Sequence, residues 1–112
     1  GMSLEVMRIF QFVKKTSPSR KAATSFGAFV REHRNKRRLT LLDVAAALEI
    51  SIPYLSRIER DREKVPRDEM IRRIANILHV SQDDAFAAAR RLPPDLQGRA
   101  AEVFALYRRF SR

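Results

Sequence analysis

The side chains of this 112-residue chain that could do chemistry are hydroxyls, two histidines and a large excess of cations. Ser51 and Ser56 have no neighbouring histidine that could act as the general base and activate a serine nucleophile. His33 and His79 fall in separate predicted helices, and neither has a cysteine, a second histidine or a carboxylate at metal-ligand spacing. The three glycines are scattered, so the sequence has no glycine-rich phosphate loop. These patterns argue against an enzyme, a metal site or a bound cofactor.

The cations carry the stronger signal. The formal net charge is +10 at pH 7, and a chain this basic is expected to attract a polyanion, most commonly DNA. The excess is local, because only Glu32 opposes the basic side chains between residues 14 and 38. Those side chains are Lys14, Lys15, Arg20, Lys21, Arg31, Arg34, Lys36, Arg37 and Arg38. The charge pattern therefore favours nucleic-acid binding.

The segment from Thr40 to Glu59 holds the elements that would position such contacts. Thr40 followed by Asp43 is the pattern of a capping box at a helix start. Ser51 is a second N-cap candidate, and Pro53 falls in the next first turn, where its missing N–H breaks no helical hydrogen bond. The apolar positions expected to face inward are Val44, Ala45, Leu48, Ile50, Leu55 and Ile58. This spacing predicts a helix-turn-helix, a unit that inserts its second helix into a DNA major groove.

The rest of the chain predicts further helices around this unit. Helices are expected at about residues 25–37, 67–79, 81–91 and from near Asp95 to the end. Leu4–Val13 fits a helix or a strand, of which we favour the helix, and residues 14–24 fit a basic linker.

We therefore expect an all-α chain in three parts. Residues 1–24 are an N-terminal extension and linker, and residues 25–80 are a DNA-binding domain. Residues 81–112 are C-terminal helices, of which the first completes the domain and the last is a candidate for dimerisation or partner binding. The chain has no cysteine, no long apolar run and no signal-peptide pattern, which predicts a cytoplasmic protein without a membrane span.

From Phe26 to Val80 the sequence resembles the lambda-repressor-like family of helix-turn-helix regulators, of the Cro/cI or xenobiotic-response-element type. The matching residues are Phe26, Gly27, Val30, Arg31, Arg34, Leu39, Thr40, Val44, Ala45, Ile50, Ser51, Tyr54, Leu55, Ser56, Ile58, Glu59, Pro66, Ile74, Ala75, Leu78 and Val80. They occur in the family's order and spacing over roughly half of the chain. The resemblance implies a compact five-helix DNA-binding domain that acts as a dimer on palindromic operators.

The resemblance also implies residue roles around a recognition helix at about 52–60. The positions that match the family's groove-facing residues are Ser51, Ile52, Pro53 and Arg57. Those that match its DNA-backbone contacts at the start of the preceding helix are Thr40 and Leu41. Arg34 and Glu59 match a salt bridge that ties the first helix to the recognition helix. Base readout is expected to depend on Arg57, because Ile52 and Pro53 offer no side-chain hydrogen bonds. The whole expected DNA-binding set is Thr40, Leu41, Ser51, Ile52, Pro53, Tyr54, Ser56, Arg57, Arg60, Lys36 and Arg38.

Three residues depart from the family pattern. Glu49 stands where the family mostly has glycine, and a left-handed backbone there would cost glutamate roughly 1 kcal/mol. Asp61 replaces a common glycine after the recognition helix, so a different loop is expected there. Leu41 replaces a frequent glutamine that binds phosphate, which removes one expected contact.

We expect a transcriptional regulator, a repressor, that binds double-stranded DNA as a homodimer with half-sites about 34 Å apart. The expected dimer seam is the final helix, through Val103, Phe104 and Tyr107. The main alternative is an antitoxin-type module, which binds a protein partner through Leu4–Val13 and Asp95–Phe110 as well as DNA. RNA binding ranks lower, because Tyr54 is the sole aromatic residue expected at the reading edge.

Overall fold

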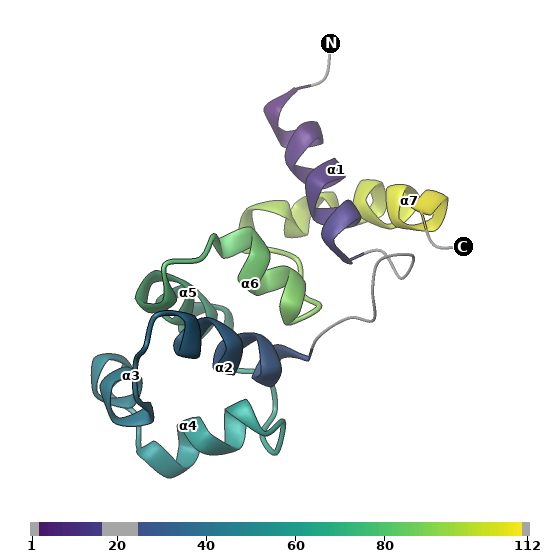
Figure 1. Cartoon of the computed structure of the whole chain (residues 1–112). Coiled ribbons are helices and arrows are strands. Elements are labelled where there is room, and N and C mark those ends of the chain that lie inside the picture. Colours follow the sequence, from purple (N-terminus) through teal and green to yellow (C-terminus); the bar gives the residue numbers. More distant parts are fainter. Residues whose placement is uncertain (1–2, 17–24, 111–112) are drawn as a thin grey trace.

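The computed structural model describes residues 3–16 and 25–110, whose regular secondary structure is helical, without a strand (Figure 1). The elements are α1 (Leu4–Thr16), α2 (Phe26–Lys36), α3 (Leu41–Leu48), α4 (Ile52–Glu59), α5 (Asp68–Leu78), α6 (Gln82–Ala88), the 3-10 helix η1 (Pro94–Arg99) and α7 (Ala100–Phe110). The all-α prediction is confirmed, and helices α2 to α6 form the expected five-helix body. Helices α1 and α7 lie beyond α6, at the opposite end of the molecule from α3 and α4.

Five helices begin at a serine or threonine whose hydroxyl accepts the N–H three residues later. Ser3, Ser25, Thr40, Ser51 and Ser81 accept these hydrogen bonds at 3.0–3.2 Å. At Thr40 the capping box is complete, because the Thr40 N–H donates to the Asp43 carboxylate at 2.8 Å. These bonds lower the pKa of Asp43. The capping predictions at Thr40 and Ser51 are thereby confirmed.

The five helices of the body all end at a non-glycine residue in the left-handed backbone region. These residues are Arg38, Glu49, Asp61, His79 and Arg90, with φ between 56° and 59°. After each of them the next N–H donates to the carbonyl five residues back, at 2.8–3.1 Å, which is the Schellman arrangement. The expected strain at Glu49 is therefore present, and it recurs at four positions where the sequence did not predict it.

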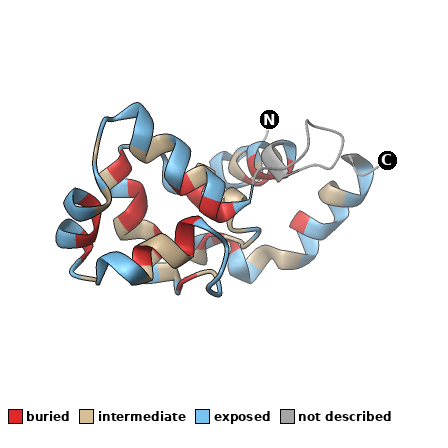
Figure 2. Cartoon of the chain, turned by 60° about the horizontal axis from the view of Figure 1, so that its bottom comes forward, coloured by how far each residue is buried: buried red, intermediate tan, exposed pale blue. Residues whose placement is uncertain are grey.

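The interior is one continuous apolar cluster that joins the body to α1 and α7. Val44, Leu48 and Leu55 are fully buried, as the helix-turn-helix pattern predicts, and Ala45 is 1% exposed. In Figure 2 the buried residues follow the inward sides of the helices, and exposed residues follow the outer sides. The small Ala45 side chain lies within the cluster that packs α3 against α4.

The N-terminal segment is a helix, as favoured, and it packs on the chain itself. Ile9 and Val13 are fully buried, and α1 contacts α6 and α7. Arg8 pairs with Asp83 at 2.7 Å and also with Asp95, which ties α1 to α6 and η1. The helix continues through residues 14–16, so the prediction of a linker there is wrong, while residues 17–24 lie outside the described part of the chain.

Two details of the C-terminal prediction are also wrong. Helix α6 ends at Ala88, three residues before the expected end at Arg91. The segment from Asp95 first forms the 3-10 helix η1, and the α-helix starts only at Ala100. Pro93 precedes η1 and Pro94 is its first residue, and the tighter 3-10 geometry suits a short connector.

Candidate nucleic-acid interface

Helix α4 presents one face to the body and the other to solvent. Its buried residues are Leu55, Ile58 and Glu59. The outer side begins with Ser51, Ile52 and Pro53, which are all exposed, and continues with Tyr54, Ser56 and Arg57, which are half-buried. Ile52 is 40% exposed. The structure therefore brings the groove-facing residues expected on α4 together on one accessible side.

Arg57 is held from two sides. Its Nε donates to Glu63 Oε2 at 2.7 Å, and its guanidinium carbon lies 5.9 Å from the centre of the Tyr54 ring. The side chain remains 43% exposed, and its two terminal nitrogens have no partner among the described residues. Because Nε is held by Glu63, the two terminal nitrogens of Arg57 remain as coplanar donors for an acceptor outside the protein. The sequence analysis did not identify Glu63 as the partner of Arg57.

The orientation of α4 depends on a buried ion pair with α2. Arg34 Nε and one terminal nitrogen donate to the two oxygens of Glu59, at 2.6 and 2.9 Å. Another Arg34 nitrogen donates to the Leu39 carbonyl at 2.9 Å. The hydrogen bond to Glu59 holds the pKa of Arg34 above its ordinary value, although burial acts in the opposite direction. The Arg34–Glu59 pair that the family resemblance implies is therefore present, with the Glu59 side chain only 1% exposed.

The C-terminal end of α4 also lies very close to the start of α2. A Cβ atom added at Gly27 would stand 2.4 Å from the Ile58 carbonyl oxygen, so this approach requires glycine. Asp61 accepts hydrogen bonds from the Gly27 N–H at 3.0 Å and from the Ser25 hydroxyl at 2.6 Å. The aspartate that replaces the family's usual glycine therefore serves as a cap for α2.

The expected phosphate-contacting residues lie around the α2–α3 turn and the end of α4. Lys36 is 63% exposed and pairs with Glu32 at 3.1 Å, which lowers the pKa of Glu32. Arg38 is exposed, and its side chain has no partner among the described residues. Thr40 is exposed at the start of α3 and Leu41 is half-buried behind it.

Arg60 lies beyond the last turn of α4, where it is exposed and its Nε lies 3.4 Å from the Ser56 carbonyl. Leu42, which the sequence analysis did not single out, is 61% exposed on α3. A lone exposed leucine is common in proteins, so this exposure alone assigns it no role. Contact of these residues with a duplex stays a prediction.

Other kinds of site receive no support from the described residues. Within residues 3–16 and 25–110 there is no cluster of histidine, cysteine and carboxylate side chains able to hold a metal ion. The helices of the same ranges are too short or too polar to cross a bilayer.

Comparison with known proteins identifies the family of the domain formed by α2 to α6. A family model described as "Helix-turn-helix domain" matches residues 25–89, which covers α2 to α6 and more than half of the chain. No curated protein and no solved structure matches the chain. The chain belongs to the helix-turn-helix domain family, in agreement with its resemblance to the lambda-repressor-like regulators.

Proposed function

We propose that this protein binds double-stranded DNA sequence-specifically and acts as a transcriptional repressor. The single observation that carries the proposal is the preoriented and accessible guanidinium of Arg57, whose side chain is 43% exposed on the outer side of α4. Family membership supports DNA binding, and the net charge of +10 favours a polyanionic partner. A cytoplasmic location is part of the same proposal.

In the proposed complex, α4 enters the major groove with Arg57 as the main reader of sequence. Its two terminal nitrogens match the O6 and N7 acceptors of guanine, and Glu63 holds Nε so that the guanidinium plane is already set. Exposed Ile52 is placed to contact a thymine methyl group. Minor contacts to base edges come from the remaining polar side chains on this side, Ser51, Tyr54 and Ser56.

Phosphate contacts fix the register in this proposal. Lys36, Arg38 and Arg60 supply cations, while Thr40 and Leu41 approach the backbone with the start of α3. Pro53 is the second residue of α4 and has no backbone N–H, so its role is to shape the first turn and not to bond a base. The phosphate contacts strengthen binding to any sequence, and therefore they control affinity more than specificity.

We propose a homodimer on a two-fold symmetric operator, because a single module of this size covers limited DNA surface. Val103, one of the expected seam residues, is 3% exposed and packed inside the chain. Its burial leaves Phe104, which is 56% exposed, as the main apolar candidate for a seam on α7, with half-buried Tyr107 beside it. The division into residues 1–24, 25–80 and 81–112 also stays a prediction.

The alternative is an antitoxin-type module that binds a protein partner as well as DNA. The observation in its favour is apolar exposure on the terminal helices, where Leu4 is 79% exposed and Met7 is 46% exposed. Against it, most of the apolar side of α1 is already covered by α6 and α7. A small toxin frame next to the gene would favour this alternative over the repressor.

Selection of bound duplexes from random DNA tests the proposal. We expect enrichment of one motif in two symmetric halves, with centres about 10 base pairs apart or a multiple of that spacing. Each half should contain a guanine that is required for binding. Enrichment of no motif, at a salt concentration where nonspecific binding is weak, would contradict sequence-specific binding.

A further inference from the structure

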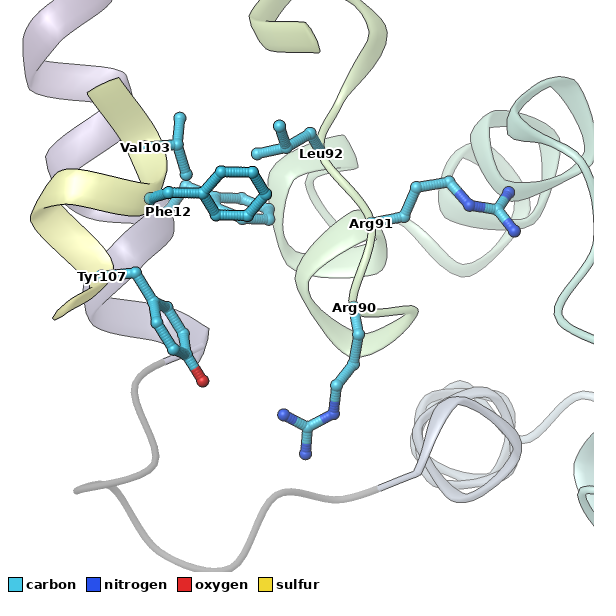
Figure 3. A pocket seen from close by; sticks show the side chains of 7 residues that line it. Phe12, Arg90, Arg91, Leu92, Val103 and Tyr107 are labelled. Atoms are coloured by element: carbon cyan, nitrogen blue, oxygen red, sulfur yellow. The ribbon is translucent and has the colours of Figure 1, made fainter. Parts of the chain in front are cut away.

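A cavity of about 280 Å³ lies between α1, α7 and the residues that follow α6 (Figure 3). Its walls are mainly apolar: Phe12 and Val103 are buried, Leu92 and Tyr107 are half-buried, and Phe104 is exposed. All these residues lie outside α3 and α4, so the cavity is separate from the proposed DNA interface. Its volume is close to the lower end of the range for small-molecule pockets, about 300 Å³.

Two arginines stand beside this apolar space, and they differ in their partners. Arg91 donates to the Pro66 carbonyl at 2.6 Å and to Asp68 at 3.0 Å, so its charge is already used within the fold. Arg90 is exposed, and its side chain has no hydrogen bond or ion pair with any described residue. In Figure 3 its guanidinium extends along the side of the cavity on which the Tyr107 hydroxyl lies.

No described carboxylate neutralises Arg90. The acidic residue on α7, Glu102, is bonded to Arg99 at 2.7 Å through each of its oxygens. A cation at the mouth of an apolar cavity, without an anionic partner among the described residues, complements a ligand that has an apolar body and one negative charge.

We propose that this cavity binds a small organic monoanion with a ring-sized apolar body, such as an aromatic carboxylate. The apolar part lies against Phe12, Leu92 and Phe104, and the anionic group meets Arg90. The walls come from α1, from the segment after α6 and from α7, so the bound ligand holds the terminal helices to the body. This site goes beyond DNA binding and does not depend on it.

The test is a titration of the isotope-labelled full chain, followed through backbone amide signals in NMR spectra. Phenylacetate carries both the ring and the charge, phenylacetamide carries the ring alone, and acetate carries the charge alone. We expect saturable shifts at Arg90, Leu92 and Val103, with none in α4. The Kd of phenylacetate should be about tenfold lower than that of either control ligand, because one charge-assisted hydrogen bond adds to apolar burial.

Matched variants separate the site from the general positive charge. Arg90→Gln should weaken phenylacetate to the level of phenylacetamide, and Arg90→Lys should restore part of the difference. Arg37→Gln, at an exposed arginine outside the cavity, should change neither ligand. Melting curves of the variants check that each is folded.

Three results would overturn the proposal. The first is equal affinity for phenylacetate and phenylacetamide, which would make the cavity a simple apolar depression. The second is an equal loss in the Arg37 and Arg90 variants, which would indicate diffuse charge attraction. The third is no saturable binding of any of the three ligands.

Discussion

Replacing Glu59 with alanine should destabilise the fold strongly, through the arginine that it leaves behind. The Glu59 side chain is 1% exposed and the Arg34 side chain 12% exposed, and two hydrogen bonds of 2.6 and 2.9 Å join them. Breaking a buried pair by removing one partner costs about 3–5 kcal/mol. Arg34 keeps its bond to the Leu39 carbonyl, so we expect a loss at or just below the lower end of this range, about 2–3 kcal/mol. For a domain of this size the melting temperature should fall by on the order of 10 °C.

Chemical denaturation followed by circular dichroism measures this change. Glu32→Ala is the matched control, because Glu32 forms an exposed pair with Lys36 at 3.1 Å and its loss should cost about 0–0.5 kcal/mol. The double replacement Arg34→Met with Glu59→Leu should recover part of the loss, since no unpaired charge remains. Equal stabilities of Glu59→Ala and Glu32→Ala would refute the conclusion that the pair fixes α4 on α2.

Three further predictions concern stability and phosphate contacts. Glu49→Gly should stabilise the fold by about 0.5–1 kcal/mol, because glycine removes the left-handed strain at φ 59°, whereas Glu49→Ala should give no gain in the same denaturation experiment. The pKa of Asp43 is lowered in the folded state, so its contribution to stability is present above the ordinary value of 3.8 and is lost as pH falls through the lower folded value. Melting curves at several acidic pH values should therefore show a smaller decline in Asp43→Asn than in the parent protein, and parallel declines would contradict the capping account. Lys36→Ala and Arg38→Ala should each weaken cognate and scrambled duplexes alike and lower the salt slope of binding by about one unit, as measured by titrations at several salt concentrations. A sequence-dependent loss in either variant would assign it to base readout instead.

The helix-turn-helix could be predicted from the sequence because its signals are local. A hydroxyl at each N-cap, a proline in the first turn of α4 and apolar positions at helical spacing all act within a few residues. The Arg34–Glu59 pair is different, because its partners stand 25 residues apart and only the family resemblance linked them.

The partner of Arg57 could not be predicted in this way. The charged residues from 60 to 64 alternate in sign, so the sequence allows several pairings. The turn through left-handed Asp61 decides between them and directs Glu63 back to α4. Four of the five left-handed helix ends were likewise hidden, because none of them has the glycine that usually marks such a position, and the left-handed backbone at Glu49 was expected only from the family resemblance.

For the terminal helices α1 and α7, prediction from the sequence was limited by contacts that are distant in the chain. The apolar pattern of Leu4–Val13 fits either a helix or a strand, and only packing against α6 and α7 selects one. The same packing buries Val103. The apolar pattern of one helix does not show whether such a residue is buried within its own chain or at a subunit interface. Both outcomes depend on tertiary contacts between segments about 90 residues apart, such as the ion pair of Glu5 with Arg99.

The most direct test of the central claim is the binding of Arg57→Ala to the selected duplex and to a scrambled one, at several salt concentrations. We expect a loss of about 1–3 kcal/mol on the selected duplex, a much smaller loss on the scrambled one, and an unchanged salt slope. The preference for guanine at one position of each half-site should disappear in the same variant. Equal losses on both duplexes with a reduced salt slope would instead make Arg57 a phosphate contact, and would contradict its role as the main reader of sequence.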